Sequence, residues 1–164
     1  MLQYRKGSLF DAPKGSILVH ACNAQGVWGA GIAAEFKERF PESFKQYEKY
    51  CQLNRGITGV SFGTTEDIIC LITSSGYGRS RETQEVILGN TLLALKDIFS
   101  TYEIKKNETL HSNKFNSGLF GVAWNHTETI LKGVLIDQPD LTWVVWDPEL
   151  EEKGNTDGSR TSDR

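Results

Sequence analysis

Three times along this chain, a glycine-containing loop leads into a helical pattern, and two of these loops follow an apolar run. The first apolar run is Ile17–Val19 and the second is Ile68–Ile72. The third loop, residues 113–124, also leads into a helical pattern. Strands that alternate with helices form a parallel or mixed sheet whose two faces are both covered. The sequence therefore predicts an α/β fold.

Periodicity and turn signals also predict where the elements lie. Strands are predicted at 2–6, 16–20, 58–62, 67–73, 113–116 and 142–146, and helices at 29–39, 42–53, 84–101 and 126–136. Pro41 is predicted to end the first helix and to start the second. Residues 103–112 are polar and are predicted to form a loop.

Length and composition limit the class of protein. The 164 residues suit one domain, which we assign to residues 1–148. The polar segment 149–164 is predicted to be a disordered tail. The net charge of −3 argues against a nucleic-acid partner, and no apolar run is long enough to span a membrane. We also expect a monomer.

The cysteines and histidines show no metal-binding pattern along the sequence. Three cysteines, an odd number without Cys-x-x-Cys spacing, argue against a disulfide framework and suit a cytoplasmic or nuclear protein. Cys51 and Cys70 are predicted to pack in the core. His111 and His126 have no ligand cluster near them in the sequence, so no metal and no other cofactor is predicted.

The first loop has the composition of a phosphate-binding turn. Gly26, Gly29 and Gly31 would let backbone N–H groups approach a phosphate, at the N-terminus of the following helix. The loop is not a Walker A motif, and its glycine order is the reverse of the dinucleotide fingerprint. A plain turn without a ligand is the alternative. Residues 113–124 repeat the arrangement, so the two loops are predicted to form two walls of one cleft.

Three segments together resemble the macrodomain, the ADP-ribose-binding fold: Gly7–Leu9, His20–Ala33 and Asn116–Val122. The fungal-type ADP-ribose 1''-phosphate phosphatases carry a similar His-x-Cys-Asn…Gly-x-Trp-Gly-x-Gly-Ile-Ala stretch and a similar Asn-Ser-Gly-Ile/Leu-Phe-Gly-Val loop. The resemblance extends from about Tyr4 to Trp146. It implies a three-layer α/β/α macrodomain with a central mixed, largely parallel sheet. It also implies hydrolysis of ADP-ribose 1''-phosphate to ADP-ribose and phosphate.

The resemblance also implies a set of substrate-binding residues. The adenine would lie near Gly7–Leu9, the pyrophosphate near Gly29–Ile32 and Ser117–Val122, and the distal ribose near Asn23. Many macrodomains have an Asp after this first glycine, where this chain has Ser8, so adenine selectivity is less secure. The full set is Gly7, Ser8, Leu9, Ala21, Cys22, Asn23, Trp28, Gly29, Ala30, Gly31, Ile32, Ala33, Asn116, Ser117, Gly118, Leu119, Phe120, Gly121 and Val122.

His20 and Asn23 are the predicted catalytic residues. An imidazole at the end of a strand can activate water or protonate the leaving oxygen, although it could instead only order the loop. Asn23 could contact the ribose or cap its own turn. Cys22 is predicted to pack, because no arginine follows it at the spacing of cysteine phosphatases. Arg79 is a candidate for contacting the terminal phosphate.

Two other functions stay open at the level of sequence. One is hydrolysis of mono-ADP-ribosyl groups or of O-acetyl-ADP-ribose, for which an ADP-ribosylated protein would be a partner. A lysine-based mechanism is disfavoured, because Ser74 and Phe120 stand where that branch of macrodomains has its Lys and Asp. The other is a non-catalytic ADP-ribose reader. His20 is a modest argument against a reader, because binding alone does not require an imidazole at that position.

Overall fold

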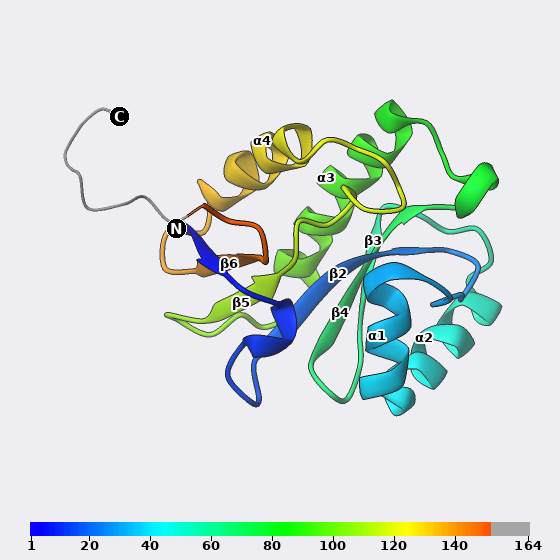
Figure 1. The fold of residues 1–164 in the computed structure, drawn as a ribbon, viewed down its shortest axis with the longest axis horizontal. Helices are drawn as coiled ribbons and strands as arrows, with labels where there is room; N and C mark the ends of the chain where they lie inside the picture. The colour runs from blue at the N-terminus through cyan, green and yellow to red at the C-terminus, as the bar shows by residue number, and fades with distance from the viewer. Residues whose placement is uncertain (152–164) are drawn as a thin grey trace.

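The computed structural model describes residues 1–151, and the predicted tail beyond Glu151 lies outside the described residues. One sheet has the strand order β1-β6-β5-β2-β4-β3 (Figure 1). Every neighbouring pair is parallel except β3 and β4. The strands are β1 (Leu2–Lys6), β2 (Ile17–Asn23), β3 (Val60–Gly63), β4 (Ile68–Ser74), β5 (Thr109–Ser112) and β6 (Thr142–Asp147).

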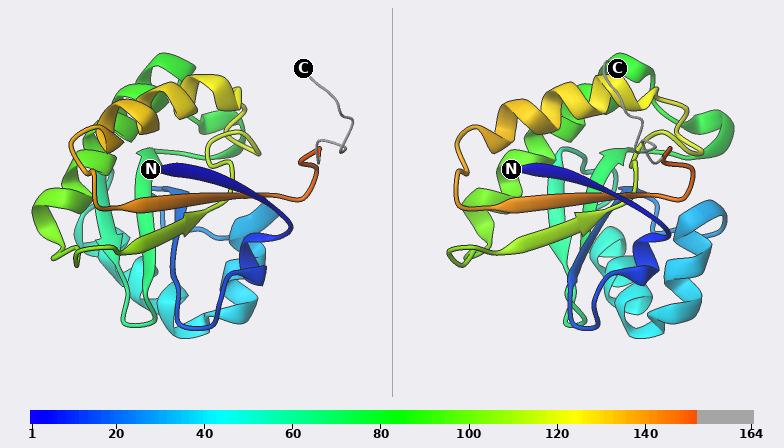
Figure 2. Two further views of the ribbon diagram at one scale, coloured as in Figure 1. Left: turned by 90° about the vertical axis from the view of Figure 1, so that its left-hand side faces the viewer. Right: turned by 60° about the vertical axis from the view of Figure 1, so that its left-hand side comes forward.

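Four α-helices cover the two faces of this sheet (Figures 1 and 2). One face carries α1 (Gly31–Arg39) and α2 (Pro41–Leu53), and the other carries α3 (Gln84–Thr101) and α4 (Trp124–Leu135). The three-layer α/β/α prediction is therefore confirmed, as is the break at Pro41. Within residues 1–151, no helix combines the length and the apolar character that crossing a bilayer requires.

Each face of the sheet has its own hydrophobic core. Leu95 and Ile98 of α3 and Leu131 of α4 pack with sheet residues on one face. On the other face, Phe36 of α1 and Tyr47 of α2 pack with β2 and β4. The two central strands are therefore held from both sides. Their carboxyl ends lie at one edge of the sheet, where open α/β sheets bind ligands.

The predicted fifth strand at 113–116 is wrong, and the predicted loop at 103–112 is correct only for residues 103–108. The strand is β5 at Thr109–Ser112, between β2 and β6. It is short and carries polar residues although it is central. Indole N–H groups of neighbouring tryptophans bond to its polar side chains, at 3.0 Å to His111 Nδ1 and 2.9 Å to Ser112 Oγ. These partners come from β6 and are invisible in a local pattern.

Asp97 of α3 attaches the edge strand β3 to the helix layer. Its Oδ2 accepts hydrogen bonds from the backbone N–H and the hydroxyl of Ser61, both at 2.8 Å. Its Oδ1 accepts one from the Thr101 hydroxyl at 2.9 Å. Burial raises the pKa of this carboxyl, but the bonds from Ser61 and Thr101 lower it more. The net pKa lies below its ordinary value of 3.8.

Asp97→Asn is expected to lower the free energy of unfolding by about 1–3 kcal/mol at neutral pH, because a charge-assisted pair of bonds is lost. A carboxyl with a depressed folded-state pKa stabilises the fold above its unfolded pKa, and this contribution is lost as the pH falls below about 4. Denaturant unfolding should therefore show a smaller difference in the free energy of unfolding between wild type and Asp97→Asn near pH 3 than at neutral pH. The exposed Asp137→Asn is the control, and a difference independent of pH would contradict this account.

Candidate functional site

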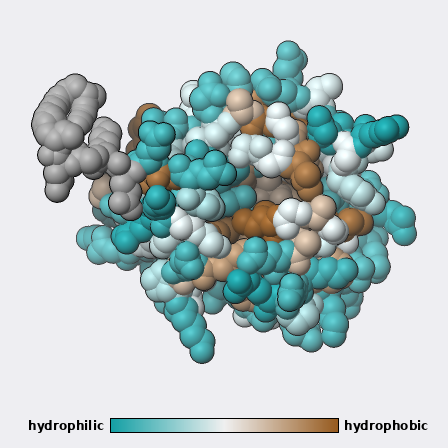
Figure 3. All heavy atoms as spheres, in the orientation of Figure 1, coloured by the Kyte–Doolittle hydropathy of each residue, from teal (hydrophilic) through white to brown (hydrophobic). Residues whose placement is uncertain are grey.

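Three loops leave the carboxyl ends of β2, β4 and β5 and meet at one edge of the sheet. We call residues 24–30 the first loop, residues 75–83 the middle loop and residues 113–123 the last loop. The last loop, yellow in Figure 1, faces the start of α1. In the space-filling view, hydrophobic residues line a hollow in this face, and hydrophilic residues surround it (Figure 3).

The loops contact one another directly. Leu119 of the last loop packs over Gly31, where a Cβ atom would lie 3.4 Å from Leu119 Cδ1. A Cβ on Gly121 would lie 3.5 Å from a guanidinium nitrogen of Arg81 in the middle loop. The two glycine loops are therefore adjacent, as the sequence predicted, and the middle loop closes the group.

Both glycine loops present unpaired backbone donors. Within residues 1–151, no hydrogen-bond acceptor is found for the N–H groups of Gly29, Ala30, Gly118, Leu119 and Phe120. Helix α1 begins directly after the first loop, and its N-cap residue Ala30 offers no side-chain cap. Free N–H groups beside an uncapped helix N-terminus favour an anionic ligand.

Asn116 holds the last loop in shape. Its backbone has a φ of +68°, a left-handed conformation that Asn tolerates better than most residues. Its side chain is buried and bonds to threonines on three elements. Oδ1 accepts from the Thr73 hydroxyl at 2.9 Å, while Nδ2 donates to the hydroxyls of Thr91 at 2.9 Å and Thr127 at 3.4 Å. Asn116 is thus committed to the scaffold.

The middle and last loops line an open cavity of about 520 Å³. Its ionisable lining groups are the guanidinium groups of Arg79 and Arg81 and the carboxylate of Glu82, which lie beside Phe120 and Gly121. Glu82 is anchored from the strand end, since its N–H donates to Ser74 Oγ at 3.0 Å. Two cations and one carboxylate therefore share a wall with a glycine loop.

Asn23 is engaged by its own loop. Its Oδ1 accepts from the N–H groups of Gln25 and Val27, at 2.9 and 3.3 Å, and from the Tyr47 hydroxyl at 3.1 Å. Its Nδ2 donates to the Val27 carbonyl at 2.7 Å. The first loop is thereby shaped around this amide, which is 6% exposed.

The side chains of His20, at the end of β2, and of Trp28, within the first loop, are buried beneath that loop and do not line the cavity. The His20 ring is completely buried and stacks on Phe36, with ring centroids 3.9 Å apart. Trp28 is 1% exposed and stacks on Tyr47. Burial opposes ionisation of the neighbouring Cys22 thiol, but a hydrogen bond from Cys70 and the electrostatic effect of His20 outweigh it. The pKa of Cys22 is well below its ordinary value of 9.0.

The segment predicted for the adenine forms a short 3-10 helix, η1 (Leu9–Asp11), beside the end of β1. Ser8 caps it, and its own N–H donates to Asp11 Oδ2 at 2.9 Å. Gly7 has a φ of +136° and packs beside Trp146. Ser8, rather than Asp, follows Gly7 in this chain. The nearby carboxylate is that of Asp11, which lies against the Ser8 backbone.

The predicted binding residues differ in exposure. Those at the surface are Gly29, Ala30, Gly31, Gly118, Leu119 and Gly121. The half-buried ones are Gly7, Ser8, Ala21, Ile32, Ala33, Ser117 and Phe120. The buried ones, which support the loops from below, are Leu9, Cys22, Asn23, Trp28, Asn116 and Val122.

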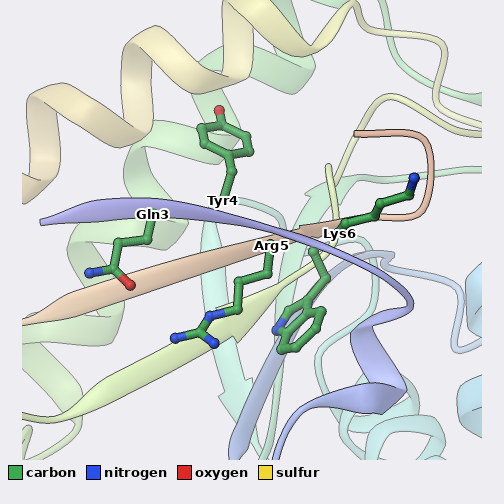
Figure 4. Close-up of a pocket in the computed structure, with 5 residues that line it drawn as sticks. Gln3, Tyr4, Arg5 and Lys6 are labelled. Atoms are coloured by element: carbon green, nitrogen blue, oxygen red, sulfur yellow. The ribbon is translucent and has the colours of Figure 1, made fainter. Parts of the chain in front are cut away.

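A larger cavity, about 680 Å³, runs along the edge strand β1, away from the three loops. Tyr4 points from it toward α4, while Gln3 and Arg5 point to the opposite side (Figure 4). The Tyr4 hydroxyl donates to Glu128 and accepts from the Trp124 indole at 2.8 Å. Burial and the bond to Glu128 raise the pKa of Tyr4 to about 12, so this hydroxyl serves packing between β1 and α4.

The sequence reads the stretch Arg79–Arg81 as the rim of a ligand site but assigns no role to Glu82, which also lines the cavity. The signal was available, because a basic and an acidic residue stand just before Thr83 and the helical pattern at 84–101. That signal carries little weight until the fold places the middle loop against the last loop.

Comparison with protein families and with related sequences gives a consistent result. The family model of the Macro domain matches residues 19–131. A Candida albicans protein named ADP-ribose 1''-phosphate phosphatase is 39% identical over 148 residues, covering 80% of this chain and 92% of its own. A Neosartorya fischeri protein of the same name is 34% identical over 173 residues, covering 77% and 86%.

Solved structures agree on the fold. The macrodomain of Mycobacterium tuberculosis DarG superposes with a TM-score of 0.74 at 27% identity, over 91% of this chain and 99% of that one. Thermosipho africanus DarTG, solved in complex with ADP-ribose, gives a TM-score of 0.68 at 16% identity, over 93% of this chain and 43% of that one. The second likeness concerns the fold alone.

Proposed function

The chain belongs to the macro domain family, and from that premise we propose that it binds ADP-ribose and hydrolyses ADP-ribose 1''-phosphate to ADP-ribose and phosphate. The names of the related Candida and Neosartorya proteins support this activity. The observation that carries it is the cavity where Arg79, Arg81 and Glu82 meet the last glycine loop. A phosphate monoester at the end of an ADP-ribose chain suits that set of groups.

The ligand is proposed to lie along the edge of the sheet where the loops meet. The free N–H groups of the first loop and the last loop hold the pyrophosphate, with the N-terminus of α1 behind it. Gly7–Leu9 lie on the adenine side. The distal ribose and its 1''-phosphate reach the cavity beside Phe120 and the middle loop.

Within the cavity, Arg81 is proposed to bind the terminal phosphate and Glu82 to handle the proton. The planar guanidinium fork can donate two charge-assisted hydrogen bonds to two oxygens of the phosphate. The Glu82 carboxylate accepts a proton from water as the water oxygen attacks phosphorus. The bond between phosphorus and the 1'' oxygen breaks, and that oxygen takes the proton from Glu82. Water, proton and leaving group are thereby balanced.

His20 and Asn23 are proposed to act through the first loop. The sequence prediction gave His20 the acid–base role, but its ring is fully buried under Phe36, and Glu82 lines the cavity. His20 supports the loop from below, and Asn23 shapes it with four hydrogen bonds. Both are therefore positioning residues in this proposal.

Arg81→Ala is expected to raise KM for ADP-ribose 1''-phosphate by about 10- to 100-fold, because a charge-assisted contact to the terminal phosphate is lost. Affinity for ADP-ribose, which lacks that phosphate, should change by less than about threefold. Kinetics and calorimetric titration measure the two effects. Exposed Arg55→Ala is the control, and an equal loss for both ligands would contradict the assignment.

Phosphate release from ADP-ribose 1''-phosphate, beside calorimetric titration with ADP-ribose, tests the proposed function. The expected result is turnover of this substrate, with little hydrolysis of O-acetyl-ADP-ribose or of an ADP-ribosylated protein. Tight binding of ADP-ribose without turnover of any of these would overturn the phosphatase and leave a reader. Preferred turnover of an adduct other than the phosphate would assign the hydrolase alternative.

A further inference from the structure

A buried group of metal-binding side chains lies below the cleft, between β2 and β4. His20 pairs in register with Cys70 across the two strands, and Cys22 lies two residues along β2 on the same face. One ligand atom of each residue lies within 4.8 Å of the others. All three residues are buried, with Cys22 the most exposed at 3%.

The polar atoms of this group are poorly satisfied by the protein. Among the described residues, both ring nitrogens of His20 contact only the sulfur of Cys22, with Nδ1 at 3.7 Å and Nε2 at 3.5 Å. The indole Nε1 of Trp28 is buried, and no partner is found for it within residues 1–151. Its ring packs against that of His20, with centroids 4.9 Å apart. Buried nitrogens normally have partners. A neutral imidazole nitrogen can find one in a metal ion, whereas the Trp28 N–H can only donate, for example to a nearby sulfur.

We propose that His20, Cys22 and Cys70 bind a soft, thiolate-seeking metal ion, zinc(II) or copper(I). With bonds of about 2.0–2.3 Å, neighbouring ligand atoms around such an ion lie roughly 3.3–3.9 Å apart. The separations between His20 nitrogens and Cys22 Sγ already have this length. Two sulfurs and one imidazole, with no carboxylate, form the donor set that soft ions prefer over magnesium or calcium.

Binding would also settle the protons and charges of this site. Each coordinating thiol gives its proton to solvent and forms a metal–sulfur bond, and the imidazole binds through one neutral nitrogen. Zinc with two thiolates is neutral overall, which suits a buried site, and a fourth ligand would complete its tetrahedral shell. Copper(I) is satisfied by three ligands. In both cases the Trp28 N–H is placed to donate to a metal-bound sulfur.

The metal site is distinct from the proposed phosphatase chemistry. The cysteines lie beneath the first loop, whereas the arginines and Glu82 line the cavity beside the last loop. The ion would join two central strands and the Trp28 side chain below the cleft. Its role would be structural. This site has no signal in the sequence, because Cys70 lies far along the chain from His20 and Cys22.

Metal analysis of the reduced full chain tests this inference. Chelator-treated protein is loaded without oxygen with zinc sulfate or with acetonitrile-stabilised copper(I), desalted, and measured by mass spectrometry. About one ion per chain is expected, with a higher melting temperature for the loaded form. Cys22→Ala and Cys70→Ala should lose most of this metal. Cys51→Ala, which removes a buried thiol outside the group, should keep it.

A spectroscopic measurement on the wild-type chain tests the proposal without relying on variants that could misfold. Cobalt(II) added to the reduced protein should give the near-ultraviolet sulfur-to-metal band of thiolate coordination, and zinc should abolish it if zinc is the preferred ion. If the cobalt band persists when zinc is added but disappears when copper(I) is added, the site would be assigned to copper(I). Absence of stoichiometric metal with both ions, or unchanged loading in folded Cys22→Ala and Cys70→Ala, would overturn the proposal.

Discussion

Glu82→Gln is expected to lower kcat for ADP-ribose 1''-phosphate by about 10²- to 10⁴-fold, the usual contribution of a positioned general base. Glutamine keeps the shape of the side chain but cannot take a proton from water. KM should stay within about threefold, because the phosphate contact comes from the arginines rather than from this carboxyl. Steady-state phosphate release and ADP-ribose calorimetry separate the two parameters.

Glu85→Gln is the matched control for this variant. Glu85 is exposed in the first turn of α3 and does not line the cavity, so its loss should leave kcat unchanged. A Glu82→Gln protein with wild-type turnover would return the acid–base role to another group. The pH–rate profile of His20→Ala then separates the two roles of the imidazole. Loss of a limb of the profile in a folded variant would assign the proton transfer to His20, whereas a lower kcat with an unchanged profile would leave His20 a positioning residue.

Gly31→Val should weaken ADP-ribose binding by at least about 100-fold, because two effects act together at the pyrophosphate loop. Gly31 has a φ of +60°, which a β-branched residue adopts only with strain. Its Cβ would also lie 3.4 Å from Leu119 Cδ1, so the added methyl groups would separate the two glycine loops. Calorimetric titration with ADP-ribose measures the loss.

Gly89→Ala provides the control for a glycine substitution. Gly89 lies in α3, is exposed, and would place a Cβ in open space. Alanine there should leave binding unchanged and raise the free energy of unfolding by about 0.5–1 kcal/mol. Wild-type affinity in a folded Gly31→Val protein would show that the ligand does not approach this backbone.

Much of the fold followed from local patterns, and its exceptions have a common cause. Strand β4 is apolar from Ile68 to Ile72, and Pro41 separates two helices, so both were predictable. Strand β5 was not, because His111 and Ser112 are polar and receive their partners from β6. A local pattern of residues does not include the partners that the neighbouring strand supplies, so it cannot predict this strand.

The site was predicted as loops more securely than as chemistry. The glycines at Gly31 and Gly121 carry a backbone requirement that shows in the sequence. Trp28, in contrast, was predicted to flank the ligand and lies in the core, where it stacks on Tyr47. The sequence around such an aromatic residue does not indicate whether its ring lies at the surface beside a ligand or in the core. Exposure and role therefore needed the structure.

The pairing of β1 with β6 has a consequence for the order of folding. These strands come from opposite ends of the described chain, and the Met1 amino group donates to the Leu141 carbonyl, 140 positions away. Closing so long a loop costs much chain entropy before any contact rewards it, so topologies with such pairings fold slowly. We expect β2 and β4, which pair closer along the chain, to gain amide protection first, and β1 to join the sheet last.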